Sequence, residues 1–222
     1  MKIYYGGHSS FLLESNNNRI LVDPMMISPK MAEKKPTLIA VSHGHGDHIG
    51  DSEKIAKKND IPIMAVFELA NYFAKRGCKT VDGHIGGKIK FDFGFIKYVT
   101  AFHGNSTPDG TATGNPCGFV FNIDGITVYH TGDTGLFGDM ELIAKQTPVD
   151  VLLCPIGDKY TMGPEDAIVA TKLVNPKIVV PMHYNTFPLI AQDPEDFKQK
   201  VEKDSKTKVV IMKANDVFEY NK

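Results

Sequence analysis

Residues 38–48 of the chain read LIAVSHGHGDH, in which four apolar residues and a serine precede three histidines and an aspartate. The apolar run at 38–41 is typical of a buried strand, so the polar residues leave a sheet at a carboxyl end, where open α/β sheets place ligands. Gly44 and Gly46 have no side chains and can adopt tight conformations that let neighbouring imidazoles converge. The alternative is a plain loop in which Asp47 caps the next helix, but that leaves three histidines without a role.

The donor atoms of this loop suit metal ions. Imidazole nitrogen and carboxylate oxygen bind borderline divalent ions such as Zn²⁺, Mn²⁺, Fe²⁺ and Ni²⁺. Four ligands this close in sequence cannot easily serve a single tetrahedral ion. The loop therefore predicts two ions, one bound by His43 and His45 and the other by Asp47 and His48.

Other predicted strands also end beside donor side chains. Three further apolar runs are followed by a potential ligand, and these ligands are His103, Asp133 and His183. Each residue alone is weak evidence, because a histidine at the end of a strand is more often a hydrogen-bonded loop or core residue. Their joint occurrence after the HxHxDH cluster favours ligation.

Working outward, the chain alternates between two kinds of pattern. Short β-rich runs predict a meander, then apolar strands alternate with amphipathic helices, and this order occurs twice, which predicts two sheets face to face with helices outside, in one α/β domain spanning 1–222. The predicted strands are 2–5, 11–14, 19–22, 38–41, 63–66, 88–91, 95–100, 118–122, 126–130, 151–154, 177–181 and 209–212, and the predicted helices are 51–58, 67–75, 164–174 and 195–203.

Composition limits the classes of protein. Of 222 residues, 42% are apolar and 23% are charged, a mixture that indicates a globular fold and excludes intrinsic disorder. The net charge of −1 disfavours a dedicated nucleic-acid binder. No apolar run approaches the ~18 residues of a membrane span, and without a secretory pattern the cytoplasm is the expected location. Three scattered cysteines, Cys78, Cys117 and Cys154, are expected to be buried small hydrophobes.

The ordered motifs resemble those of the metallo-β-lactamase superfamily, and the resemblance runs from about residue 3 to residue 183. It implies a four-layer αββα sandwich with a two-metal site. It implies that the first metal is held by His43, His45 and His103, the second by Asp47, His48 and His183, and that Asp133 bridges them. It also implies that Asp23 orients a ligand or the loop, the alternative being a turn residue before Pro24.

Three segments resemble one branch of that superfamily, the small stand-alone metal-dependent hydrolases of unassigned substrate. They are residues 7–11 (GHSSF), 160–167 (YTMGPEDA) and 182–188 (MHYNTFP). The commonest zinc class of the exported β-lactamases has a cysteine where Asp133 stands, so the hydrolysis of antibiotics is not expected.

Two divalent ions lower the pKa of a bridging water toward neutrality and polarise a carbonyl or phosphoryl oxygen. We therefore expect a bridging hydroxide to cleave a small ester, lactone, thioester or phosphodiester, with Asp47 or Asp133 as the catalytic residue that orients the hydroxide and passes a proton. The expected partner is a small-molecule substrate, and a homo-oligomer stays open. Alternatives are a nuclease acting on RNA, or a metal-bound binding or regulatory module without turnover.

Three further side chains stand beside the predicted ligands. His8 follows a predicted strand, and it either contacts a ligand or the substrate or is a hydrogen-bonded core histidine. Tyr184 and Asn185 directly follow His183 and are candidates for contact with the substrate or its oxyanion.

Overall fold

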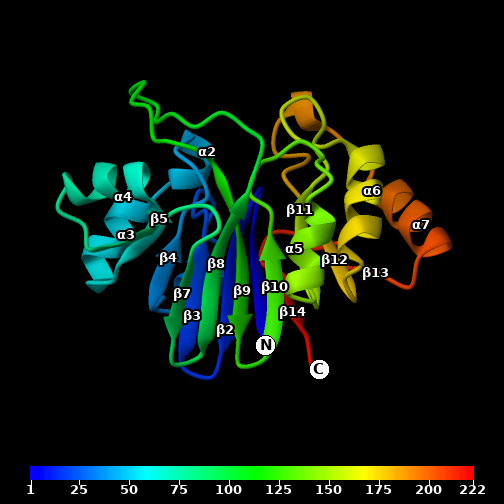
Figure 1. The fold of residues 1–222 in the computed structure, drawn as a ribbon, viewed down its shortest axis with the longest axis horizontal. Helices are drawn as coiled ribbons and strands as arrows, with labels where there is room; N and C mark the ends of the chain where they lie inside the picture. The colour runs from blue at the N-terminus through cyan, green and yellow to red at the C-terminus, as the bar shows by residue number, and fades with distance from the viewer.

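The computed structural model describes residues 1–222 and contains two seven-stranded sheets that lie face to face, with helices on the outer faces (Figure 1). This arrangement confirms the predicted α/β sandwich of four layers. No helix of the chain combines the length and the apolar character needed to cross a bilayer.

The first sheet has the strand order β14-β1-β2-β3-β4-β5-β6. Neighbours from β14 to β3 pair antiparallel, and neighbours from β3 to β6 pair parallel. Its strands are β1 (Lys2–Gly7), β2 (Ser10–Ser15), β3 (Asn18–Val22), β4 (Leu38–Ala40), β5 (Ile63–Val66), β6 (Thr80–Gly83) and β14 (Val217–Glu219).

The second sheet repeats this design with the order β13-β12-β11-β10-β9-β8-β7. Neighbours from β7 to β10 are antiparallel, and those from β10 to β13 are parallel. Each half thus passes from a meander to parallel strands joined by helices, as predicted. The strands are β7 (Lys88–Phe91), β8 (Gly94–Thr100), β9 (Cys117–Ile123), β10 (Ile126–His130), β11 (Val151–Pro155), β12 (Ile178–Met182) and β13 (Lys208–Val209).

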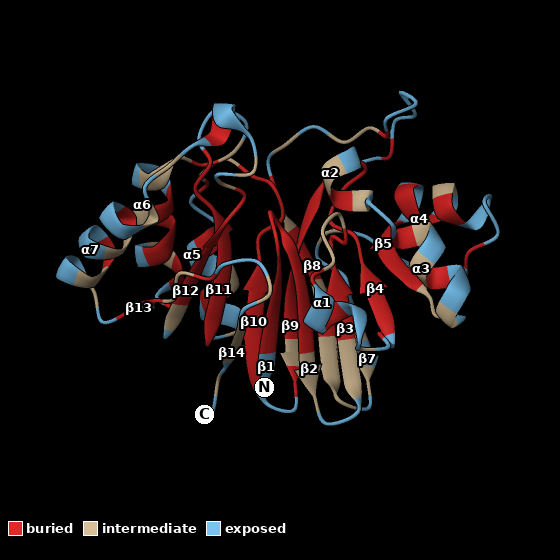
Figure 2. Cartoon of the chain, turned by 180° about the vertical axis from the view of Figure 1, so that it is seen from behind, coloured by how far each residue is buried: buried red, intermediate tan, exposed pale blue.

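Helices cover the parallel part of each sheet. Helices α3 and α4 pack on the first sheet, whereas α5, α6 and α7 cover the second, and Figure 2 shows buried strands between helices that are exposed on their outer sides. The helices are α1 (Pro29–Ala32), α2 (Gly46–Ile49), α3 (Ser52–Asn59), α4 (Phe67–Ala74), α5 (Met140–Gln146), α6 (Pro164–Val174), α7 (Pro194–Asp204) and the 3₁₀ turn η1 (Pro188–Ile190). All three cysteines are free and buried, as predicted.

The structure differs from the predicted elements mainly at the edges. The strands β6 and β14 were not predicted, because each is a half-exposed outer strand that backbone pairing holds without an apolar run to mark it. Helix α5 was also missed. The predicted strand 209–212 was too long, because only Lys208–Val209 pairs with β12.

Strand direction determines where the polar loops meet. Because β1 and β3 are each antiparallel to β2, and β4 is parallel to β3, the carboxyl ends of β1, β3 and β4 share one edge of the first sheet. The same reasoning places the carboxyl ends of β8, β10 and β12 at one edge of the second sheet. The residues that follow these six strands are the candidates for a common site.

Candidate metal centre

The loop after β4 is held in a fixed shape by hydrogen bonds. The Asp23 carboxylate accepts from the Ser42 backbone N–H at 2.8 Å and from its hydroxyl at 2.7 Å. The Gly44 N–H donates to Asn105 Oδ1 at 2.6 Å. A Cβ at Gly44 would lie 2.7 Å from the Thr113 hydroxyl, so the close approach of these loops requires glycine there.

Three histidines form the first set of neighbouring donor atoms, which we call the outer group: His43, His45 and His103. Their ligand atoms all lie within 4.8 Å of one another, and His43 Nε2 lies 3.1 Å from His45 Nδ1. The ring of His103 lies 5.0 Å from each of the other two. His43 is buried, whereas His45 and His103 are partly open to solvent.

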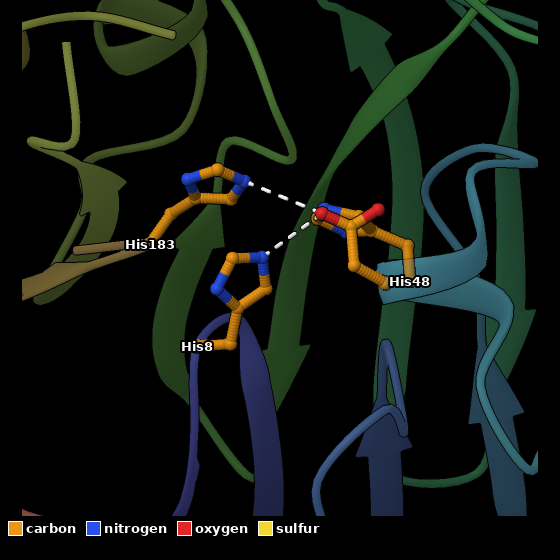
Figure 3. A group of neighbouring side chains, drawn as sticks. His8, His48 and His183 are labelled. Atoms are coloured by element: carbon orange, nitrogen blue, oxygen red, sulfur yellow. Dashed lines mark hydrogen bonds and ion pairs between the residues drawn. The ribbon is translucent and has the colours of Figure 1, made fainter. Parts of the chain in front are cut away.

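A second set, the inner group, consists of His8, Asp47, His48 and His183. Figure 3 shows the rings of His8, His48 and His183 turned toward one another from three different parts of the fold. The carboxylate oxygen Oδ2 of Asp47 lies 3.1 Å from His8 Nε2, 3.7 Å from His183 Nε2 and 4.0 Å from His48 Nε2. All three histidines are buried, and only Asp47 reaches solvent.

Asp133 lies between the two groups. Its Oδ2 atom is 2.9 Å from His183 Nε2 and 3.2 Å from His48 Nε2 in the inner group, and 3.7 Å from His103 Nε2 in the outer group. Asp133 also forms a compact set of donor atoms with His43 and His48. It is therefore the one carboxylate that faces ligands of both groups.

Several donor atoms of this cluster are buried without a hydrogen bond. They are His48 Nε2, Asp133 Oδ1 and both ring nitrogens of His183. His48 Nε2 approaches the Asp133 carboxylate, but the geometry is not that of a hydrogen bond. A buried polar atom left unpaired costs about 1–3 kcal/mol. A cation near His48 Nε2, His183 Nε2 and the Asp133 carboxylate would satisfy donors that face one another, and these nitrogen and oxygen donors fit a borderline divalent ion.

The protonation states also suit a cation. Burial lowers the pKa of His43 and of His103, which favours the neutral imidazole that a metal needs. Burial alone would raise the pKa of Asp133, but His48 and His183 hold it well below its usual range. Burial would lower the pKa of His183, yet Asp133 raises it to about 9. Positive charge is thus favoured on the rings that face Asp133, where a divalent ion would replace the proton.

Hydrogen-bond partners fix the orientation of two histidines of the inner group. His48 Nδ1 lies 2.7 Å from the buried Asp23 carboxylate, and the Ser10 hydroxyl donates to the Asp23 carbonyl. His8 Nδ1 lies 3.0 Å from the hydroxyl of Thr186. Partners of this kind set the tautomer and ring angle of a ligand histidine.

The backbone at the inner group is unusual. His8, Asp23 and His183 all have left-handed φ angles, between 43° and 55°. Such a conformation costs a non-glycine residue about 1–2 kcal/mol and is found disproportionately at functional sites. The His183 N–H donates to the His8 carbonyl at 2.9 Å, so the two strained residues hold each other in place across the two sheets.

A cavity of about 260 Å³, which we call the metal cavity, opens onto these side chains. Its floor consists of ligand candidates from both groups together with Asp133, and its remaining wall consists of aromatic and aliphatic side chains. The lining residues are His45, Asp47, His103, Asp133, Tyr160, His183, Phe187 and Ile190.

Comparisons with known proteins agree with this geometry. Residues 2–183 match the family model for the beta-lactamase superfamily domain. A UPF0173 metal-dependent hydrolase of Desulforamulus reducens is 49% identical over 224 residues, covering 97% of this chain and 98% of that protein. The chain belongs to the UPF0173 metal-dependent hydrolases of the metallo-β-lactamase superfamily. This membership confirms the resemblance found in the motifs.

Two further relatives of the hydrolase extend the comparison. A UPF0173 metal-dependent hydrolase of Pelotomaculum thermopropionicum is 47% identical and covers 99% of this chain and all of that protein. The solved structure of Igni18, a metallo hydrolase from the archaeon Ignicoccus hospitalis, is 37% identical with a TM-score of 0.90, covering 99% of each chain.

The hydrolase does not bring every candidate residue to the metal cavity. Tyr184 and Asn185 do not line the metal cavity. They line a different cavity, to which His8 also contributes. The Asn185 side chain bonds to the backbone of Gln192 through both its amide nitrogen and its oxygen, which shapes the loop after His183. Contact of these two residues with a substrate stays a prediction.

Three apolar residues of the metal cavity were not identified from the sequence. They are Tyr160, Phe187 and Ile190, which we call the apolar wall. A usable signal was present, because Tyr160 and Phe187 are aromatic residues inside two segments that resemble the family.

Two histidines of the chain lie outside both groups of donor atoms. The ring of His130 is held by the backbone, because Gly132 N–H donates to its Nδ1 and its Nε2 therefore donates to the Ser9 carbonyl. His84 lies on the surface.

Proposed function

We propose that the hydrolase uses two divalent transition-metal ions, most simply Zn²⁺, to cleave a small ester, lactone, thioester or phosphodiester. The observation that carries this proposal is that donor atoms of the outer and inner groups lie close together on either side of Asp133, and that donors of His48, His183 and Asp133 are buried without a hydrogen bond. The proposed ligands are His43, His45 and His103 for one ion, Asp47, His48 and His183 for the other, and Asp133 between them.

When bound, such a pair of ions lowers the pKa of coordinated water and polarises the oxygen of the scissile group. The residues of the chain supply the rest. Asp133 is 3% exposed and ionised, so it holds His48 and His183 in place rather than exchanging protons with solvent. The Asp47 side chain is 32% exposed and lines the cavity, so it is the carboxylate that can reach the reacting atoms. Burial alone would raise its pKa, but His183 and His8 hold that pKa well below its usual range, so Asp47 acts as an ionised carboxylate that orients the attacking water and accepts its proton.

His8 and Asp23 act as positioning residues in this proposal. His8 Nε2 contacts the Asp47 carboxylate and so fixes the oxygen that would move the proton. Asp23 holds both His48 and the backbone of the metal loop through Ser42. Neither residue lines the cavity.

The direct test measures metal and turnover together. Inductively coupled plasma mass spectrometry of the purified protein should find up to two transition-metal ions per chain. A chelator should abolish hydrolysis across a panel of esters, lactones, thioesters and phosphodiesters. The variant His48→Ala should lose metal and hydrolysis together. The surface variant His84→Ala is the control and should retain both. Unchanged turnover after complete removal of metal would contradict the proposal.

A metal-bound binding module is the second outcome of the same test. It would be indicated by two bound ions without turnover across the whole panel.

A further inference from the structure

We propose that the substrate is a small, uncharged carboxylic ester, lactone or thioester with an apolar acyl group, which the wall Tyr160, Phe187 and Ile190 binds. This inference rests on the proposed hydrolytic function and narrows it, because it excludes phosphodiesters and RNA as the main substrates.

The first observation is the distribution of exposed apolar side chains. The chain has seven large hydrophobic residues that are exposed, and two of them, Tyr160 and Phe187, line the cavity that contains the ligand candidates. The buried side chain of Ile190 completes the apolar part of the lining. Exposed apolar groups gathered in one place mark a binding surface rather than an ordinary protein exterior.

The second observation is the position of this wall relative to the donor atoms. The same cavity of about 260 Å³ is lined by the ligand candidates and by the apolar residues together. The ring of Phe187 packs edge-on against His8 at 5.7 Å, so the wall is fixed relative to the inner group. A carbonyl group at the donor atoms would therefore place its acyl substituent against the wall. The volume is below the about 300–1,000 Å³ of sites for drug-sized ligands, so the substrate is small.

The third observation is charge. No lysine or arginine lines the cavity itself, and Lys159, whose Nζ lies 5.6 Å from the centre of the Tyr160 ring, is outside its lining. The segment that carries Tyr160 also carries Asp158, which lines a neighbouring acidic cavity. That cavity contains four carboxylates and one lysine, namely Asp158, Glu165, Asp166, Asp196 and Lys200. A polyanion that approached the site would meet these carboxylates, which disfavours RNA.

The reaction balances with water alone. The oxygen of water forms a bond to the acyl carbon, and the bond from that carbon to the alcohol oxygen or thiol sulfur breaks. One proton of water goes to the leaving alcohol or thiol, and the other leaves with the carboxylic acid product. No oxidant, reductant or further reactant is needed.

The test uses the metal-loaded protein and p-nitrophenyl esters that share one leaving group. From acetate to butyrate, kcat/KM should rise about three- to fourfold for each added methylene, the value for burial of one methylene. Mono-p-nitrophenyl succinate, which ends in a carboxylate, should react at least about tenfold more slowly than the butyrate. A flat or falling series, a preference for the succinate, or faster cleavage of bis(p-nitrophenyl) phosphate would overturn the inference.

Matched variants locate the effect. Phe187→Ala and Tyr160→Ala should flatten the chain-length series. Phe67→Ala and Leu142→Ala remove residues of similar exposure that do not line the cavity, and they should retain the full series. Equal flattening by both pairs would contradict the assigned wall.

A binding measurement separates this inference from the proposed function. Calorimetry with acetohydroxamate, butyrohydroxamate and hexanohydroxamate reports the wall without any turnover. Affinity that rises with chain length in the wild type, and rises less in Phe187→Ala, supports the apolar wall even if no ester is hydrolysed. Equal affinity for all three hydroxamates would overturn it even if esters are cleaved.

Discussion

The outer and inner groups provide the same number of histidines but differ in how the protein supports them. The outer group is partly open to solvent at His45 and His103, and neither of these rings makes a hydrogen bond through a second nitrogen. His43 is the one outer ring with such a contact, at 3.0 Å from the Ser42 hydroxyl, whereas in the inner group His48 contacts the Asp23 carboxylate and His8 contacts Thr186 from the far side of the ring. Since such partners raise metal affinity, we expect the inner group to hold its ion more tightly and release it more slowly.

The largest effect is expected where the two groups meet. Asp133→Asn keeps the shape of the side chain but removes the charge that faces both groups, so kcat/KM should fall by about 10³-fold and metal content should decrease. Asp150→Asn is the control, because Asp150 is also a buried carboxylate with hydrogen bonds but lies outside the site. An Asp133→Asn protein that retains two ions and full activity would show that the charge of Asp133 does not link the two groups.

The next effect is the loss of a single ion. Native mass spectrometry should find one ion in His45→Ala and one in His183→Ala, because each variant damages only one group. In the wild type, a chelator should remove metal in two phases, and the fast phase should be missing from His45→Ala. Loss of both ions from both variants would show that the groups do not bind independently.

A smaller effect is expected from the partner of His48. Asp23→Asn should weaken binding of the inner ion by about 10- to 100-fold and leave the outer ion unchanged. Competition with a chromophoric chelator measures both affinities in one titration. Asp150→Asn, which changes a buried and hydrogen-bonded carboxylate outside the site, is the matched control. Equal weakening of both ions would instead indicate that Asp23 supports the whole loop through Ser42.

The smallest effect concerns the hydroxyl that contacts His8. Thr186→Val removes one hydrogen bond, worth about 0.5–1.5 kcal/mol, so affinity for the inner ion should fall about two- to twelvefold. Thr186→Ser retains the hydroxyl and should restore the wild-type affinity. The same titration measures the affinity of both variants for the inner ion. Equal affinities would show that Thr186 does not support the inner group.

The sequence and the structure agree where a signal is strong and local. The apolar runs of the central strands predicted two sheets, because a buried strand must be apolar over its whole length. The edge strands β6 and β14 carry no such signal, since one side of each faces solvent. Tyr184 and Asn185 were placed beside His183 by sequence adjacency, but a left-handed turn at His183 and Asn185 directs them away from the metal cavity.

By itself, the sequence determined the kind of chemistry. The HxHxDH loop and the donors after later strands indicate a site for divalent ions, because side-chain type limits the class of ion that can be bound. Only the tertiary structure decided which donors face one another, that His8 joins the inner group, and that an apolar wall lies beside them. The physical reason is that these contacts join residues from different strands of two sheets, and their positions depend on strand order and direction rather than on neighbours along the chain.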